Sequence, residues 1–136
     1  MLRTITFGLL FLVSCSSYPF TVAIPIKGIM GDVAELYEGE TVGQTNGKIT
    51  LAAVSTGTRC QGNYKYTFVS PDGIGSSGIA KFQCSDGRTA SLYFMTETEE
   101  KGYGFGKDSK GAPAVFTFGK SDFDTVEIYK RYVQKN

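Results

Sequence analysis

The sequence predicts an all-β fold, an antiparallel meander or a small barrel or sandwich with one disulfide, followed by a possible short C-terminal helix. Three observations lead to this prediction. Several short segments alternate apolar and polar side chains, turns that contain glycine separate them, and a pair of these segments each carry a cysteine. Strands at short, regular spacing are typical of antiparallel sheets that close on themselves.

The clearest strands are the two that carry Cys60 and Cys84. In the stretch NYKYTFV, Tyr64 and Tyr66 share one face, and in GIAKFQC the side chain of Phe82 shares a face with Cys84. A period of two indicates a strand that is buried on one side only. Both cysteines have the parity of the apolar face, so both are expected to point into the core.

The turn between these strands predicts their register. If Cys60 faces Cys84 across an antiparallel pair, the midpoint of the pairing is Asp72. This residue lies in the turn tetrapeptide SPDG, where Pro71 presets one φ angle and Gly73 accepts a positive one. The disulfide and the turn therefore predict each other, and two buried thiols are the alternative.

The same register pairs Tyr64 with Ala80 and Tyr66 with Gly78, although the stretch GIGSSG allows a slip of two positions. On the chain-entropy model, a bridge that closes about 25 residues stabilises the fold by roughly 3–4 kcal/mol.

Other strands are predicted from runs that adjoin turns. Residues 48–54 follow the turn pair Asn46-Gly47, residues 88–95 follow Ser85-Asp86-Gly87, and residues 114–119 form an alternating run. Asp86, Gly87 and Arg88 are predicted as a structural turn. Residues 21–38 give weaker signals, and Pro25 favours an edge position there.

The glycine-rich stretch GYGFG, residues 102–106, poses a choice between a phosphate-binding loop and a strand. A phosphate loop requires a helix directly after it, so that helix N–H groups face the anion. Here a turn and a β-type run follow instead, which favours a strand with glycines on one face. The bare face would let a backbone or an aromatic ring approach closely.

The segment DFDTVEIYKRYVQK near the C-terminus differs from the rest. Val126, Tyr129 and Val133 recur at helical spacing, and either Asp122 or Asp124 is a candidate cap. We predict a helix, with a strand as the alternative.

Composition excludes several classes of function. The chain has 14 basic and 13 acidic residues, which argues against nucleic acid as a partner. The absence of His removes the Ser-His-Asp triad and any His-based zinc site. We therefore expect no metal, no cofactor and no nucleotide.

The N-terminus has the features of a lipoprotein signal. Arg3 precedes an apolar run over residues 5–13, which is shorter than the roughly 20 residues of a membrane-spanning helix. The sequence LVSC follows and resembles a bacterial lipobox, in which the Cys receives a diacylglycerol and becomes the first residue. The predicted organisation is a signal peptide at 1–14, a lipidated N-terminus and short tether at 15–20, and one β-rich domain at 21–136.

Cys15 is thus the predicted lipidation site, which leaves Cys60 and Cys84 in a compartment that permits disulfides. Ser16, rather than Asp, follows Cys15. By resemblance to lipoprotein sorting in Gram-negative bacteria, this indicates the outer membrane, facing the periplasm. The alternative is an ordinary secretory signal that contains a cysteine by chance.

Four motifs in order, GTRCQGNYKY, GIAKFQCSDGR, GYGFG and FTFG, resemble a pattern found in small bacterial lipoproteins and exported proteins of uncharacterised function. That pattern reads G-x-C-x-G-x-Y/F, G-x-G-x-F-x-C-x-D-G-R, G-x-G-x-G and F-x-F-G, and it covers about residues 45–119. The resemblance implies the pairing of Cys60 with Cys84 and a turn at Asp86-Gly87-Arg88. It departs at Thr58 and Ala80, where the pattern has Gly, and it implies no activity.

These observations predict a lipid-anchored cell-envelope protein with a non-catalytic binding or structural role and an unknown protein or glycan partner. One alternative is a lysozyme inhibitor, because FQCSDGRTASLYF resembles one hairpin of the membrane-bound c-type lysozyme inhibitor family. Another is an enzyme that uses Glu97, Glu99 and Glu100, since paired carboxylates hydrolyse glycosides. A solvated charged turn is the simpler interpretation of those residues.

Overall fold

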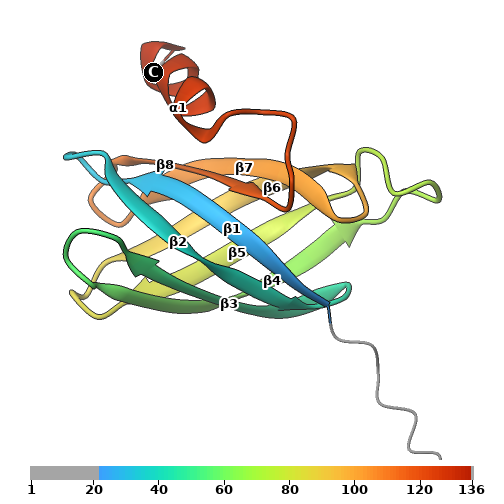
Figure 1. Ribbon diagram of the computed structural model, residues 1–136, viewed down its shortest axis with the longest axis horizontal. Coiled ribbons are helices and arrows are strands. Elements are labelled where there is room, and N and C mark those ends of the chain that lie inside the picture. Colours follow the sequence, from blue (N-terminus) through green and yellow to red (C-terminus); the bar gives the residue numbers. More distant parts are fainter. Residues whose placement is uncertain (1–21, 136) are drawn as a thin grey trace, which may run out of the picture.

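Residues 22–135 are described by a computed structural model, in which they form an eight-stranded antiparallel barrel followed by a helix (Figure 1). The strands are β1 Val22–Met30, β2 Glu35–Gly43, β3 Asn46–Ala53, β4 Arg59–Phe68, β5 Ser77–Cys84, β6 Thr89–Thr98, β7 Lys101–Asp108 and β8 Pro113–Phe118, and the helix is α1 Thr125–Lys135. Each strand pairs with its neighbours in sequence, and β1 pairs with β8 to close the barrel. The all-β prediction is confirmed.

The predicted hairpin forms in the predicted register. Cys60 lies opposite Cys84 and is disulfide-bonded to it, and β4 pairs with β5 so that Tyr64 faces Ala80 and Tyr66 faces Gly78. The connecting turn is also where it was predicted. The N–H of Gly73 donates to the carbonyl of Ser70 at 3.1 Å, and Gly73 has a φ of 76°.

The predicted turn at Asn46-Gly47 is wrong by two positions. The turn lies at Gln44 and Thr45, and Asn46 and Gly47 begin β3. Gly47 is needed inside the barrel, because a Cβ at this position would overlap the ring of Tyr64 on the neighbouring strand. Packing across the strands therefore overrides the local turn preference of an Asn-Gly pair.

Pro25 lies inside β1 but near a local edge. β1 pairs with β2 along its whole length, whereas its register with β8 runs only from Ile26 to Met30. Pro25 therefore sits just beyond the part of β1 that is paired on both sides. Its carbonyl accepts a hydrogen bond from the N–H of Gly119 at 2.8 Å. A residue without an N–H is tolerated at this position.

The barrel interior is built from aromatic rings that lie over glycines. Four glycines face a ring on the directly paired residue of the next strand, and a Cβ at any of them would collide with that ring. These pairs are Gly28 with Phe116, Gly47 with Tyr64, Gly78 with Phe94, and Gly102 with Phe118. Glycine on one strand thus makes room for a large ring on the other inside a narrow barrel.

The stretch GYGFG is a strand, as predicted, and forms the centre of β7. A Cβ at Gly102 would meet the ring of Phe118, so this face points into the barrel. The two aromatic residues point outward towards the C-terminal segment. The ring of Tyr103 lies 5.0 Å from that of Phe123, and the ring of Phe105 lies 5.4 Å from that of Tyr132.

The C-terminal helix forms as predicted and contacts β8 and β1 on the outside of the barrel (Figure 1). Asp124 is its cap, because its Oδ1 accepts from the N–H of Val126 at 2.8 Å and from Glu127 at 3.2 Å. Asp122 is not a cap; it forms an ion pair with Lys101.

The spacing of Val126, Tyr129 and Val133 predicted the helix, but these three residues do not all lie on its buried face. Val126 and Val133 are 47% and 42% exposed. The side that meets the barrel is instead fixed by Thr125, whose hydroxyl hydrogen-bonds that of Thr117, and by the stacking of Tyr132 on Phe105. The half-buried face of the helix thus includes Thr125, Tyr129 and Tyr132, and the two valines lie outside it.

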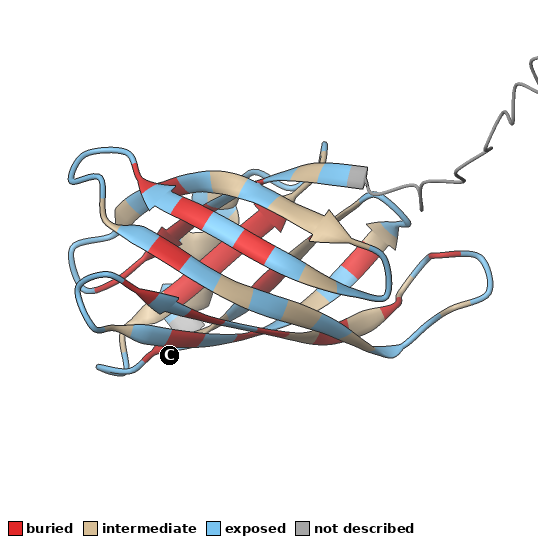
Figure 2. Ribbon diagram, turned by 90° about the horizontal axis from the view of Figure 1, so that it is seen from below, coloured by how far each residue is buried: buried red, intermediate tan, exposed pale blue. Residues whose placement is uncertain are grey.

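Buried and exposed residues alternate along most strands, as expected for a barrel with a packed interior (Figure 2), whereas residues 114–117 of β8 are all buried. The largest fully buried side chains are Met30, Tyr37, Leu51, Cys60, Val115 and Phe116. Met30, Tyr37 and Cys60 lie at strand ends next to the turns at residues 31–34, 54–58, 85–88 and 109–112. We refer to this as the closed end. The open end carries the turns at 44–45, 69–76 and 99–100 and the start of β1.

Candidate functional site

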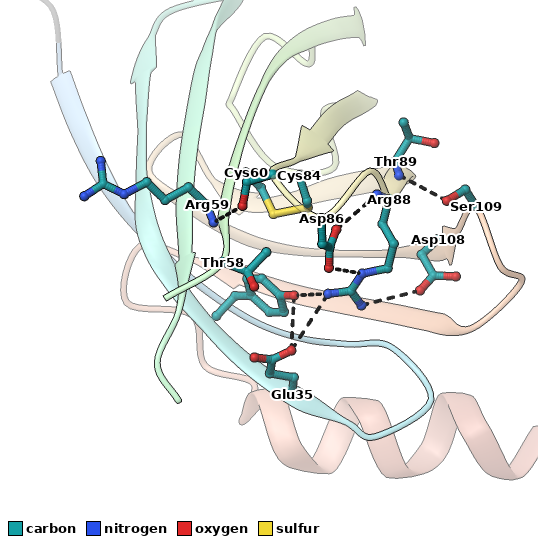
Figure 3. The surroundings of a disulfide bond; sticks show 12 residues. Glu35, Thr58, Arg59, Cys60, Cys84, Asp86, Arg88, Thr89, Asp108 and Ser109 are labelled. Atoms are coloured by element: carbon teal, nitrogen blue, oxygen red, sulfur yellow. Dashed lines mark hydrogen bonds and ion pairs between the residues drawn. A yellow bond between two sulfur atoms is a disulfide. The ribbon is translucent and has the colours of Figure 1, made fainter. Parts of the chain in front are cut away.

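The closed end is filled by the largely buried side chain of Arg88 and its partners (Figure 3). The side chain of Arg88 is only 12% exposed. It donates from Nη2 to the hydroxyl of Tyr37 at 2.6 Å and from Nε to Asp86 Oδ2 at 2.7 Å. The carboxylates of Glu35 and Asp108 lie 3.8 and 3.9 Å from its terminal nitrogens. Strands β2 and β7 are thus joined to the turn before β6 by one side chain.

The electrostatics of this cluster favour the charged state of the ion pair. Burial alone would raise the pKa of Asp86, but hydrogen bonds from the N–H and guanidinium of Arg88 lower it below its ordinary value. Burial raises the pKa of Tyr37, so its hydroxyl stays protonated. Within residues 22–135, no buried side-chain N or O lacks a hydrogen-bond partner. The cluster is satisfied, and we interpret it as the plug of the barrel.

The predicted turn at Asp86-Gly87-Arg88 is present beside this plug. The N–H of Gly87 donates to the carbonyl of Cys84 at 3.0 Å, and Gly87 has a φ of 91°. The sequence marked Arg88 only as a turn residue. Its role in the plug was missed because its partners Glu35, Tyr37 and Asp108 lie on distant strands. In the hairpin that resembles the lysozyme inhibitors, its guanidinium therefore points inward.

The open end contains a cavity of about 510 Å³, which we call the barrel cavity. This volume is within the range of small-molecule sites, about 300–1,000 Å³. Its walls are mostly apolar, and the aliphatic and core aromatic residues among them are Ile24, Ile26, Ile49, Val69, Ala80, Leu92 and Phe116. The cavity extends from the middle of the barrel to the turns at the open end.

Four more aromatic side chains line the cavity nearer its mouth: Tyr64, Tyr66, Phe94 and Phe118. They form a chain of edge-to-face contacts. The centroids of Tyr66 and Phe94 are 5.1 Å apart, and that of Phe94 is 6.1 Å from Phe118. Burial raises the pKa of Tyr64 and Tyr66, so both phenols are neutral at physiological pH.

One side of the mouth is a rigid loop, residues 69–76. The N–H of Ser76 donates to the hydroxyl of Thr96 at 2.9 Å, and that hydroxyl donates to the carbonyl of Gly73 at 2.8 Å. The predicted turn at Pro71-Asp72-Gly73 belongs to this loop. Asp72 accepts from the hydroxyl of Ser70 at 2.6 Å, a bond that helps to lower its pKa. The loop is therefore tied to the end of β6.

The structure separates the three glutamates that the sequence placed together. Glu97 accepts from the hydroxyl of Ser121 at 2.7 Å and from the N–H of Asp122 at 3.2 Å, and so it holds the connection to α1. Glu99 and Glu100 instead line the mouth of the cavity. Of the described residues that line the cavity, none is Lys or Arg.

The predicted lipidation of Cys15 stays a prediction. Cys15 lies outside the described residues. In the described part of the chain, no group of Cys, Asp and Glu side chains is arranged to hold a metal ion. The helix in that part is neither long nor apolar enough to cross a membrane.

The barrel thus has two distinct ends: a charged plug beside a disulfide, and an apolar cavity with an acidic mouth. No protein-family model, curated protein or solved structure matches the chain.

Proposed function

We propose that this protein is a lipid-anchored, non-catalytic binding protein of the bacterial cell envelope, and that its barrel cavity holds a small apolar ligand. The observation that supports this most is the cavity itself. It has the volume of a small-molecule site and walls of aliphatic and aromatic side chains, and its lining residues lie in the middle and at the open end of the barrel.

The direction in which the chain enters the barrel fits a membrane-bound binding protein. β1 begins with Val22 at the open end. Residues 16–21 can span at most about 20 Å when fully extended, so a lipid on Cys15 would keep the cavity mouth near the bilayer. The same end carries Phe68, Val69 and Ile74, which are 57%, 58% and 61% exposed. An apolar ligand would then exchange with the membrane over a short path.

Support for a non-catalytic role comes from the way the carboxylates are used. Glu35, Asp86 and Asp108 surround Arg88, and Glu97 binds the segment before α1. Of the clustered glutamates, Glu99 and Glu100 remain, on an exposed turn.

Ligand binding is tested by titration with the neutral fluorescent probe N-phenyl-1-naphthylamine. We expect saturable binding to the wild-type protein. Ala80 faces the cavity and is 6% exposed, so Ala80→Phe should fill part of it and weaken binding at least about ten-fold. Ala52→Phe is the matched control, because Ala52 is exposed on the outer face of β3. Equal binding by the two variants, or none by the wild type, would contradict the proposal.

The anchor is tested separately in intact cells. Cys15→Ala should abolish labelling with a radioactive or clickable fatty acid and release the protein from the membrane fraction. Retention of the variant in membranes with unchanged mass would show that Cys15 is not lipidated.

A further inference from the structure

We infer that the barrel cavity selects an apolar organic cation: an amphiphile with an ammonium group at the mouth and a hydrocarbon part in the interior. This inference rests on the proposed function, because it names the class of ligand that the same cavity would take. It depends on the walls of the cavity, on the charges at its mouth and on the aromatic rings between them.

The deep part of the cavity has no group that would bind a charge. Its floor is formed by Ile26, Ile49, Leu92 and Phe116, and all four residues are buried. Burying an ionised group among such residues without a partner is strongly unfavourable. The charged part of any ligand must therefore stay near the mouth, and the hydrocarbon part must fill the floor.

The mouth favours positive charge over negative charge. Glu99 and Glu100 line it, and no Lys or Arg is among the described residues that line the cavity. Glu99 lies against the rigid loop, because a Cβ on Gly73 would collide with its side chain. An anionic headgroup would meet two like charges with no compensating cation, whereas an ammonium would meet two opposite charges.

The aromatic side chains add a second preference for a cation. Tyr66, Phe94 and Phe118 lie between the floor and the mouth, and the first two contact each other edge to face. Aromatic ring faces attract ammonium groups, most strongly where water is excluded. The phenols of Tyr64 and Tyr66 are neutral, so they do not offset this attraction.

The test compares three amphiphiles that share one dodecyl chain and differ in the headgroup: dodecyltrimethylammonium, dodecanol and dodecyl sulfate. Each is added to displace N-phenyl-1-naphthylamine from the full-length protein, the two ionic amphiphiles below their critical micelle concentrations and dodecanol below its solubility limit. We expect the ammonium to bind at least about ten-fold more tightly than the sulfate, with the alcohol in between.

The double variant Glu99→Gln and Glu100→Gln should reduce the preference for ammonium over sulfate to about three-fold or less. The matched control is Glu38→Gln and Glu40→Gln on the outer face of β2, which changes the net charge equally. A loss of preference in both double variants would mean that the whole charge of the protein acts, and would overturn the inference.

The outcomes separate this inference from the proposed function. If no amphiphile displaces the probe and the probe itself does not bind, the proposed function fails. If all three amphiphiles bind the wild type equally, the cavity binds apolar chains but does not discriminate between charged headgroups, and only the inference fails. Preferential binding of the sulfate would also overturn it.

Discussion

The two ends of the barrel are formed by the same eight strands but differ in how their charged side chains are placed. At the closed end Arg88 gathers three carboxylates and a tyrosine, and the disulfide joins β4 to β5. At the open end Glu99 and Glu100 face an apolar cavity. Buried charges are stable only when they are paired and hydrogen-bonded, whereas charges beside solvent need no partner. The comparison indicates that the charged residues at the closed end stabilise the barrel, whereas those at the open end lie beside an apolar cavity.

Backbone regularity differs between the ends in the same way. The pairing of β4 with β5 shifts register between Tyr66 and Phe68, and that of β6 with β7 shifts between Thr96 and Thr98. Both irregularities lie towards the open end. A bulge bends a strand and increases its twist, so it can widen one end of a barrel without changing the other.

The largest effect on stability is expected from removal of the disulfide at the closed end. Cys60→Ala with Cys84→Ala should lower the free energy of unfolding by about 3–4 kcal/mol, because the bridge closes a separation of 24 residues. Urea unfolding of the variant and of the reduced wild type should agree. Because the bridge is at the closed end, probe affinity of the folded variant should change less than two-fold. Free, alkylatable thiols in protein purified from its export compartment would contradict the bridge.

The second test removes the buried cation. Arg88→Met leaves Asp108, with a side chain only 1% exposed, and Tyr37 without their cationic partner. We expect a loss of about 3 kcal/mol in the free energy of unfolding, since an unpaired buried charge is costly. Arg59→Met is the control, because Arg59 is exposed near the same end and should change stability little. Equal effects of the two variants would mean that the plug is not stabilising.

The third test is a substitution in β7, at Gly104. We expect it to have a smaller effect on stability and to change the cavity as well. A Cβ at Gly104 would lie 2.8 Å from the carbonyl oxygen of Tyr93 and 3.1 Å from the Cβ of Phe94. Gly104→Val should therefore cost about 1–3 kcal/mol in stability and weaken probe binding, whereas Ala52→Val should do neither. Calorimetric titration with nucleotide or pyrophosphate should show no saturable heat. Such binding, lost on Lys107→Ala, would favour a phosphate loop after all.

The smallest effect concerns pH at the closed end. The folded-state pKa of Asp86 is below its ordinary value of 3.8, and Arg88 stays charged at acidic and neutral pH. The carboxylate therefore contributes stability above its unfolded pKa, and this contribution is lost as pH falls through the folded pKa. The difference in unfolding midpoint between wild type and Asp86→Asn should shrink from about pH 6 to about pH 3. A constant difference would mean that its ionisation is not coupled to folding.

Local patterns in the sequence predicted the hairpin, but they predicted neither the plug at the closed end nor the cavity at the open end. The parity of Cys60 and Cys84 and the intervening turn predicted the register, because both constraints act within about 25 residues. The partners of Arg88 and the walls of the cavity come from strands far apart in sequence. These residues come together only when the barrel closes, and the local alternation of apolar and polar residues does not show which strands will then be neighbours. The side of the helix that faces the barrel depends likewise on distant residues, such as Phe105 on β7.

The topology has a consequence for the order in which the barrel folds. Every strand pairing is a hairpin between sequence neighbours except that of β1 with β8, which brings Met30 opposite Ala114. The chain-entropy cost of contacts grows with separation along the chain, so hairpins such as β4–β5 should form early and the β1–β8 pairing last. Helix α1 contacts both β1 and β8, which places it across this last junction. Hydrogen exchange should accordingly be fastest, among the strands, in the amides that join β1 to β8, and faster still when α1 is removed.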